Sequence, residues 1–246
     1  MGDCYRGGEE ATERVCRPLL RYAVEFDDVL VITALSRIGA WRLQPGSRCQ
    51  MRPQTGQFAG QPCGAQLSEL GDHCTQCRAG QGRVRLHNSA RRALAAEMRS
   101  DGLVALEEFT APSLTQRDAS GKAIDGIADI AVRAPWSAQH VFLDLTFVTT
   151  SSVKHRASTV QAAIRAAAAH KRQRYQGCMV PIAFSDKGRP DIAAVEALYA
   201  LASAAATPES ATPGRMLNRW LRSMEVARSA ALAGFLGACF VYSFST

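Results

Sequence analysis

The apolar residues after position 87 follow two different periods, which predict an alternation of helices and strands. A spacing of three and four residues predicts helices over 88–101, 158–177 and 190–206. Asn88 or Ser89 is the expected N-cap of the first helix, and Gly102 is its expected stop. Alternating or continuous apolar runs predict strands over 103–110, 124–133, 140–148 and 178–185.

These elements follow one another in the order α-β-β-β-α-β-α. Three consecutive strands favour an antiparallel meander, and a helical crossover to a fourth strand favours a parallel pairing. The predicted fold class is therefore α/β, with helices around a mixed sheet. Pro181 cannot donate to a sheet ladder, so the fourth strand is expected at an edge or in an irregular position.

The rest of the chain has weaker patterns. Residues 45–82 are rich in Gly, Pro and Gln and lack a periodic apolar pattern, so this stretch needs a metal or remains a loop. We expect four regions: a helical or irregular N-terminal segment, a Cys/His region, the α/β domain, and a linker with a C-terminal helix, over 1–48, 49–86, 87–206 and 207–246.

The apolar tail is interrupted by Arg228. Only about 18 uncharged residues follow this arginine, which is marginal for a membrane span. A packed terminal helix is favoured over a membrane segment, and no membrane partner is expected.

Two strand-like runs, each largely apolar on both faces, carry an aspartate near their middle, Asp129 and Asp144. A buried carboxylate is costly unless a cation meets it. Side chains alternate along a strand, so Thr146 shares the face of Asp144. If the two strands pair, the aspartates can converge at one end of the sheet. The alternative is a pair of strand-end acids in solvent.

The helix after these strands carries a lysine on its apolar stripe. At 100° per residue, Ile164, Ala168, Lys171 and Tyr175 share one face. Lys171 is therefore expected to point toward the sheet and the two aspartates, unless it snorkels to solvent. Two carboxylates suit Mg²⁺ or Mn²⁺, and a lysine beside the metal can stabilise charge developing on a phosphate.

The net charge of +7 is concentrated between residues 151 and 190. The cations of this block, set against Asp186 alone, are Lys154, Arg156, Arg165, Lys171, Arg172, Arg174, Lys187 and Arg189. Such a block suggests a polyanionic partner, usually nucleic acid, or a solvated face.

The cysteines suggest a zinc site. Tetrahedral zinc needs four sulfur or nitrogen ligands. The motif GDHCTQC offers either His73 with Cys77 or Cys74 with Cys77, Cys63 is a third ligand, and Cys49 would be the fourth. Met1 is followed by charged sequence without a secretory pattern. A disulfide framework is then not expected, and the alternative to zinc is reduced thiols in a loop.

The order of these motifs resembles a known family. A helix, three strands with an aspartate and then Asp/Glu-x-Lys, a helix and a strand is the plan of the PD-(D/E)xK restriction-endonuclease-like fold. The motifs GDHCTQC, RLHNSARRAL, GIADIAV, LDLTFV and AAHKRQRY resemble the endonuclease region near the C-terminus of site-specific non-LTR retrotransposon proteins, over roughly residues 49–190.

This resemblance implies Mg²⁺-dependent nicking of DNA, and the element RNA is a further candidate partner. It implies Asp129 and Asp144 as the metal-binding carboxylates, and Cys49, Cys63, His73 and Cys77 as the zinc ligands of a small hairpin, with Cys74 to spare. Glu97 or Glu107 is a candidate third carboxylate; either residue is more often a surface charge. Contacts with DNA phosphates are expected from Arg78, Arg83, Arg85, Arg172 and Arg174. His87 has three expected roles: completing the hairpin, capping the helix or touching DNA.

The sequence departs from the family at the strand lysine, where Thr146 stands. Lysine migration to the following helix occurs in this superfold, and Lys171 is the natural replacement. Two functions follow: a metal-dependent DNA endonuclease, or a catalytically dead, zinc-stabilised nucleic-acid-binding remnant. Either implies a C-terminal piece of a larger element protein or a domesticated or decayed copy. A nuclear or other reducing intracellular compartment is expected.

Overall fold

The architecture comes from a computed structural model of the chain. It describes residues 48–53, 59–66, 73, 77, 79, 81–117, 120–149, 159–185 and 188–241. The predictions for residues 1–47 and for Cys74 lie outside this part of the chain. So do those for the cations Arg78, Lys154, Arg156 and Lys187.

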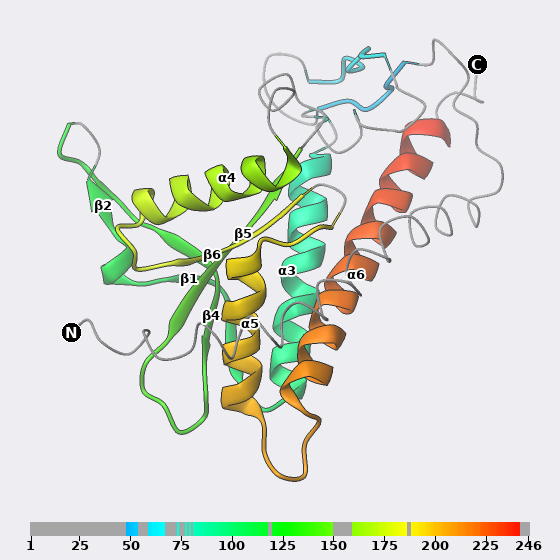
Figure 1. The fold of residues 1–246 in the computed structure, drawn as a ribbon. Helices are drawn as coiled ribbons and strands as arrows, with labels where there is room; N and C mark the ends of the chain where they lie inside the picture. The colour runs from blue at the N-terminus through cyan, green and yellow to red at the C-terminus, as the bar shows by residue number, and fades with distance from the viewer. Residues whose placement is uncertain are drawn as a thin grey trace.

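The described residues form an α/β fold (Figure 1). Its helices are α3 (Gly82–Ser100), α4 (Val160–Arg174), α5 (Ile192–Ala205) and α6 (Pro213–Val241), with a short 3-10 helix η1 (Pro112–Leu114). Its strands are β1 (Val104–Thr110), β2 (Gln116–Arg117), β3 (Ala123–Ile124), β4 (Ile127–Arg133), β5 (Val141–Val148) and β6 (Val180–Ser185).

The main sheet is mixed, as predicted. Its strand order is β1-β4-β5-β6, with β2 and β3 forming a separate hairpin. β1 and β5 both pair with β4 in antiparallel orientation, whereas β6 pairs with β5 in parallel orientation after the crossover through α4. Pro181 lies on β6, an edge strand, where one side of the strand needs no ladder donor.

Helices cover the two faces of the sheet unequally. Figure 1 shows α4 on one face and α3, α5 and α6 on the other. The larger core combines strand residues such as Leu143 and Leu145 with α3, α5 and α6, whereas Val148 packs with Ile164 and Ala168 of α4. This alternation along β5 places Asp144 on the α4 side of the sheet.

The first helix begins earlier than predicted. The expected cap at Asn88 or Ser89 is wrong, because α3 already begins at Gly82. The buried residues Gly82, Leu86, Ala90 and Leu94 continue the four-residue spacing without a break. The predicted boundary between regions 49–86 and 87–206 consequently falls inside α3.

The C-terminal helix shares the main core. Buried side chains of α6, including Trp220, lie in the same apolar cluster as α3 and α5. Arg228, which interrupts the apolar tail, is buried beside Glu225 and forms an ion pair with it. Among the described residues, none of the helices is both long and apolar enough to cross a lipid bilayer.

Candidate functional site

The two aspartates meet in a pocket, which confirms their predicted convergence. Asp129 comes from β4 and Asp144 from β5, and their carboxyl groups are close enough for each to shift the pKa of the other. The β4–β5 ladder ends at Ile130 and Leu143, one residue before the aspartates, so the strands separate there. The pocket measures about 250 Å³ and is lined by Arg83, His87, Asp129, Asp144, Leu145, Thr146, Phe147 and Lys171.

Asp129 is held by a backbone group and by a histidine. Its Oδ2 atom accepts a 2.6 Å hydrogen bond from the backbone N–H of Leu145 and lies 3.1 Å from Nε2 of His87. The same Nε2 lies 3.2 Å from the carbonyl oxygen of Leu145. Because a carbonyl oxygen only accepts, Nε2 of His87 carries the hydrogen and donates it.

Lys171 points toward the sheet as predicted and reaches one of the two aspartates, Asp144. Its Nζ lies 2.8 Å from Oδ2 of Asp144. The neighbours of Lys171 on the helical stripe, Ile164, Ala168 and Tyr175, are buried. Oδ2 of Asp144 is buried and has no well-directed hydrogen bond within the described structure, so its contact with Lys171 is mainly that of an ion pair.

The surroundings shift the pKa values of the two carboxyl groups in opposite directions. Burial raises the pKa of Asp144 above its usual value, and the adjacent Asp129 adds to the rise, while Lys171 opposes it. Burial alone would also raise the pKa of Asp129, but the hydrogen bond and charge of His87 and the Leu145 N–H together hold that pKa below its usual value. Asp129 therefore keeps its negative charge more firmly than Asp144 does.

The pKa of His87 is raised, whereas that of its partner Asp129 is lowered. Burial disfavours the imidazolium, but the hydrogen bond with Asp129 and the charge of this aspartate raise the pKa of His87 above its usual value. His87 and Asp129 thus favour an ion pair.

The structure does not bring the candidate third carboxylates to this pocket. Oε2 of Glu97 accepts a 2.7 Å hydrogen bond from Arg219 of α6, and its Oε1 accepts one from Ser223 at 2.6 Å. Glu107 forms ion pairs with Arg91 and Arg99. Both acids therefore belong to contacts between α3 and its neighbours.

His87 is a pocket residue for which the sequence left three other roles open. His87 lies in the second turn of α3, four residues before the buried Arg91. The sequence would have placed it on this buried helical face if the helix start at Gly82 had been recognised. Its partner was not readable, because the contact requires β4 and β5 to separate at Asp129. Phe147 also lines the pocket, although its ring packs against the larger core on the other face of the sheet.

The predicted DNA-contacting arginines occupy two helices beside the pocket. Arg83 lines the pocket, and Arg85, also on α3, is exposed. Arg172 and Arg174 are exposed at the end of α4, where the Arg174 guanidinium lies 5.3 Å from the centre of the Tyr175 ring. These cations are therefore accessible to a polyanion.

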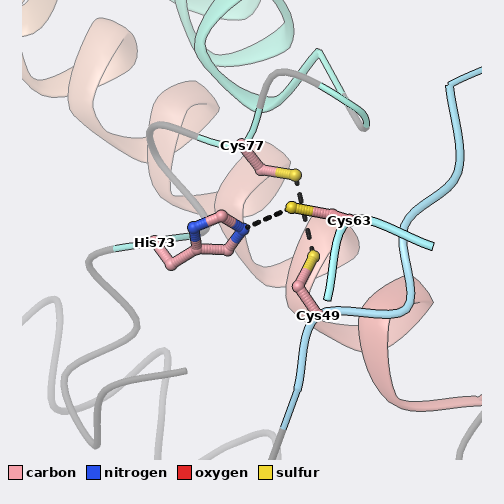
Figure 2. Close-up of side chains that lie close together, drawn as sticks. All are labelled: Cys49, Cys63, His73 and Cys77. Atoms are coloured by element: carbon pink, nitrogen blue, oxygen red, sulfur yellow. Dashed lines mark hydrogen bonds between the residues drawn. The ribbon is translucent and has the colours of Figure 1, made fainter. Parts of the chain in front are cut away.

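The four predicted zinc ligands also converge. The ligand atoms of Cys49, Cys63, His73 and Cys77 all lie within 4.8 Å of one another, and Figure 2 shows the four side chains pointing toward a common centre. Cys49 and Cys63 lie on facing segments of a hairpin whose backbone pairs Cys49 with Ala65 and Cys63 with Met51. This arrangement is compatible with the predicted zinc hairpin.

The distances within this cluster suit tetrahedral zinc. Ligands at the usual zinc distances lie about 3.8 Å apart for two sulfurs and about 3.6 Å apart for sulfur and nitrogen. Sγ of Cys49 lies 3.6 Å from Sγ of Cys77, and Sγ of Cys63 lies 3.4 Å from Nε2 of His73. Burial lowers the pKa of His73, which favours the neutral, ligating imidazole.

No family model, curated protein or solved structure matches this chain.

Proposed function

We propose that this chain is a metal-dependent DNA endonuclease of the retroelement type, which nicks its target by hydrolysing a phosphodiester. The observation that carries the proposal is the meeting of Asp129, Asp144 and Lys171 in one pocket. The order of the sequence motifs supports the retroelement type, and the exposed arginines on α3 and α4 support a polyanionic substrate.

The donor set of the pocket fits Mg²⁺ or Mn²⁺. Two neighbouring carboxyl groups repel each other when both are ionised, and Oδ2 of Asp144 is buried without a directed hydrogen bond in the described structure. Carboxylate oxygens are the ligands that these cations prefer. Held by Asp129 and Asp144, such a cation would polarise the scissile phosphate and lower the pKa of a water molecule.

The side chains of the pocket support the same reaction. Water adds to phosphorus while the P–O bond to the leaving sugar oxygen breaks, and negative charge grows on the phosphate oxygens. The Lys171 ammonium stabilises this charge from its position beside Asp144. His87 orients Asp129 by hydrogen bonding, and Arg83 provides a cation for a DNA phosphate at the pocket wall.

Nicking of supercoiled plasmid in Mg²⁺ or Mn²⁺ tests the proposal. Asp144→Asn and Lys171→Met are each expected to slow nicking about 100-fold or more, because each removes a charge at the reacting phosphate. Asp125→Asn is the matched control, since Asp125 is an exposed carboxylate just before β4. Equal nicking by wild type, Asp144→Asn and Lys171→Met would refute the proposed site.

One observation favours a second function, that of a zinc-stabilised nucleic-acid-binding module without catalysis. Thr146 lines the pocket at the strand position where the family carries lysine. The module would bind DNA and lack nicking with either cation. Wild-type binding without nicking would select this second function.

A further inference from the structure

One residue of β1 has a backbone conformation that strands do not normally adopt. Glu108 has φ of +51°, in the left-handed region, although it lies within Val104–Thr110. Outside glycine, the other described residues with positive φ are Gln81 and Gln176, which lie just before α3 and just after α4. An ordinary L-residue populates this region about tenfold less than glycine does, so the surrounding structure must hold it.

This conformation occurs directly opposite Asp129. The β1–β4 ladder pairs Glu107 with Ile130 and Phe109 with Ala128, but it omits the intervening pair of Glu108 and Asp129. The β4–β5 ladder also stops at Ile130. Within the described strands, Asp129 therefore pairs in neither ladder, although β4 is an interior strand.

Side chains of β1 and β4 also change the face of the sheet to which they point near Glu108 and Asp129. In a regular strand, residues two or four apart face the same side. Ile130 nevertheless packs in the core with α3, α5 and α6, whereas Ala128 packs in the cluster at the end of α4. Ala105 and Phe109 of β1 divide between the same two clusters. At the same level, the Asp129 carboxylate accepts the backbone N–H of Leu145.

A buried arginine anchors the unusual residue. Arg91 of α3 has a side chain that is 5% exposed, and its Nη1 lies 2.6 Å from Oε1 of Glu108. Arg91 lies one helical turn after His87, which contacts Asp129. Helix α3 therefore contacts both members of the omitted pair, Glu108 through Arg91 and Asp129 through His87.

We propose that Glu108 and Arg91 are positioning residues for Asp129. The left-handed backbone at Glu108, anchored by Arg91, releases Asp129 from the sheet ladders and directs its carboxylate to Leu145 and the pocket. The functional meaning of this device rests on the proposed endonuclease function. The position of the Asp129 carboxylate can be measured without a nicking assay, because the Leu145 N–H donates a hydrogen bond to it.

The test is a series of substitutions at position 108: Gly, Asn, Ala and Val. All four remove the carboxylate that contacts Arg91, so they differ in how readily the backbone adopts positive φ. Hydrogen exchange of the Leu145 amide, measured by NMR, is expected to be slowest with Gly, then Asn, Ala and Val. Exchange is expected to be about tenfold faster with Val than with Gly. The Leu143 amide, in the intact part of the ladder, is the internal control.

A second readout concerns the pocket itself. Titration with Mn²⁺, followed by electron paramagnetic resonance, is expected to give affinities in the same order, with Gly the highest and Val the lowest. Nicking in Mg²⁺ is expected to follow this order.

Glu107 provides a matched control series. It is also an acidic residue in contact with Arg91, but it pairs regularly with Ile130. A regular strand favours Val over Gly, so the order of effects at position 107 is expected to reverse. A flat series at position 108, or the same order at both positions, overturns the inference. If the Val variant does not fold, the comparison of Ala with Gly decides.

Failure of the proposed endonuclease function can be distinguished from failure of this positioning inference. A wild-type protein that neither nicks DNA nor binds Mn²⁺ contradicts the endonuclease. The Leu145 exchange series still decides whether Glu108 positions Asp129.

Discussion

Leu145 connects three elements through its two backbone groups. Its N–H donates to Oδ2 of Asp129 on β4, and its carbonyl accepts from Nε2 of His87 on α3. The adjacent residue on β5 is Asp144, which pairs with Lys171 of α4. The positions of the two aspartates are consequently linked through a single peptide unit, although their strands have separated.

The role of His87 is testable with a conservative substitution. His87→Leu removes the N–H that donates a hydrogen bond to Asp129. His87→Gln retains an N–H donor at a similar distance from the helix. Loss of a hydrogen bond that orients a metal-binding carboxylate commonly lowers metal affinity about tenfold or more. Mn²⁺ affinity, measured by electron paramagnetic resonance, is thus expected to fall in the Leu variant and to remain near wild type in the Gln variant.

Asn88→Ala is the control for this comparison. Asn88 contacts the other ring nitrogen of His87, with Oδ1 3.3 Å from Nδ1, and does not line the pocket. Unchanged Mn²⁺ affinity in His87→Leu would contradict the orienting role.

The difference between Lys171 and His87 shows what the sequence could predict at this scale. Helical periodicity was enough to direct Lys171 toward the sheet, because Ile164 and Ala168 marked the buried stripe. The partner of His87 depends on the separation of β4 and β5. That separation occurs at the level of Glu108, whose irregular backbone no periodicity predicts.

At the scale of the element, α3 connects the Cys/His cluster to the pocket. The helix begins five residues after Cys77, and the Gly82 N–H donates to the Cys77 carbonyl over 3.3 Å. Its N-cap residue, Gln81, provides no side-chain hydrogen bond, and Arg83 and Arg85 place positive charge at the positive end of the helix dipole. The first turn of α3 therefore has little local stabilisation.

This arrangement predicts that zinc stabilises the first turn of α3. Elemental analysis of reduced protein is expected to give about one zinc per chain, as one four-ligand site requires. Removal of zinc by a chelator is expected to increase hydrogen exchange over residues 82–86 while leaving 92–98 nearly unchanged. Mass spectrometry of peptic fragments measures both segments.

Two cysteine variants provide the comparison. Cys63→Ser is expected to lose zinc and to reproduce the increase in exchange, whereas Cys178→Ser is not, since Cys178 is exposed and outside the cluster. A folded, metal-free wild type with unchanged exchange at 82–86 would show that the cluster does not stabilise α3.

The elements themselves were largely readable from the sequence. Strand alternation and helical spacing predicted the order of the elements along the chain, because local apolar periods follow the two core faces. The connections between these elements then predicted the mixed sheet. The start of α3 was missed because Asn88 and Ser89, two residues favoured as caps, occur inside a helix that the buried Leu86 continues backward.

At the scale of the whole molecule, two helices that are distant in sequence each contribute a cation to one pocket, Arg83 from α3 and Lys171 from α4, and both carry further exposed arginines. Arg83 and Arg85 come from α3, while Arg172 and Arg174 come from α4, on opposite faces of the sheet. The sequence indicated the basic block of α4 by composition. Arg83 and Arg85 were also expected to contact DNA phosphates. That Arg83 lines the same pocket as Lys171 was not predicted, because it depends on how the helices cross the sheet.

This distribution predicts how DNA binding depends on salt. Each phosphate neutralised contributes about −0.9 to the slope of log K against log salt concentration for duplex DNA. Arg172→Ala and Arg174→Ala are each expected to reduce the magnitude of this slope by about 0.9. Fluorescence anisotropy from 50 to 300 mM salt, without added divalent cation, measures the slopes before cleavage begins.

Arg215→Ala is the matched control, because Arg215 is exposed in the first turn of α6, at the end of that helix far from α4 (Figure 1). Its slope is expected to equal that of wild type, since Arg215 does not line the pocket and this end of α6 lies far from α4 (Figure 1). Equal slopes for all four proteins would mean that the cations of α4 form a solvated face. An equal reduction in all three variants would instead indicate attraction by the net charge of +7 rather than contacts at the pocket.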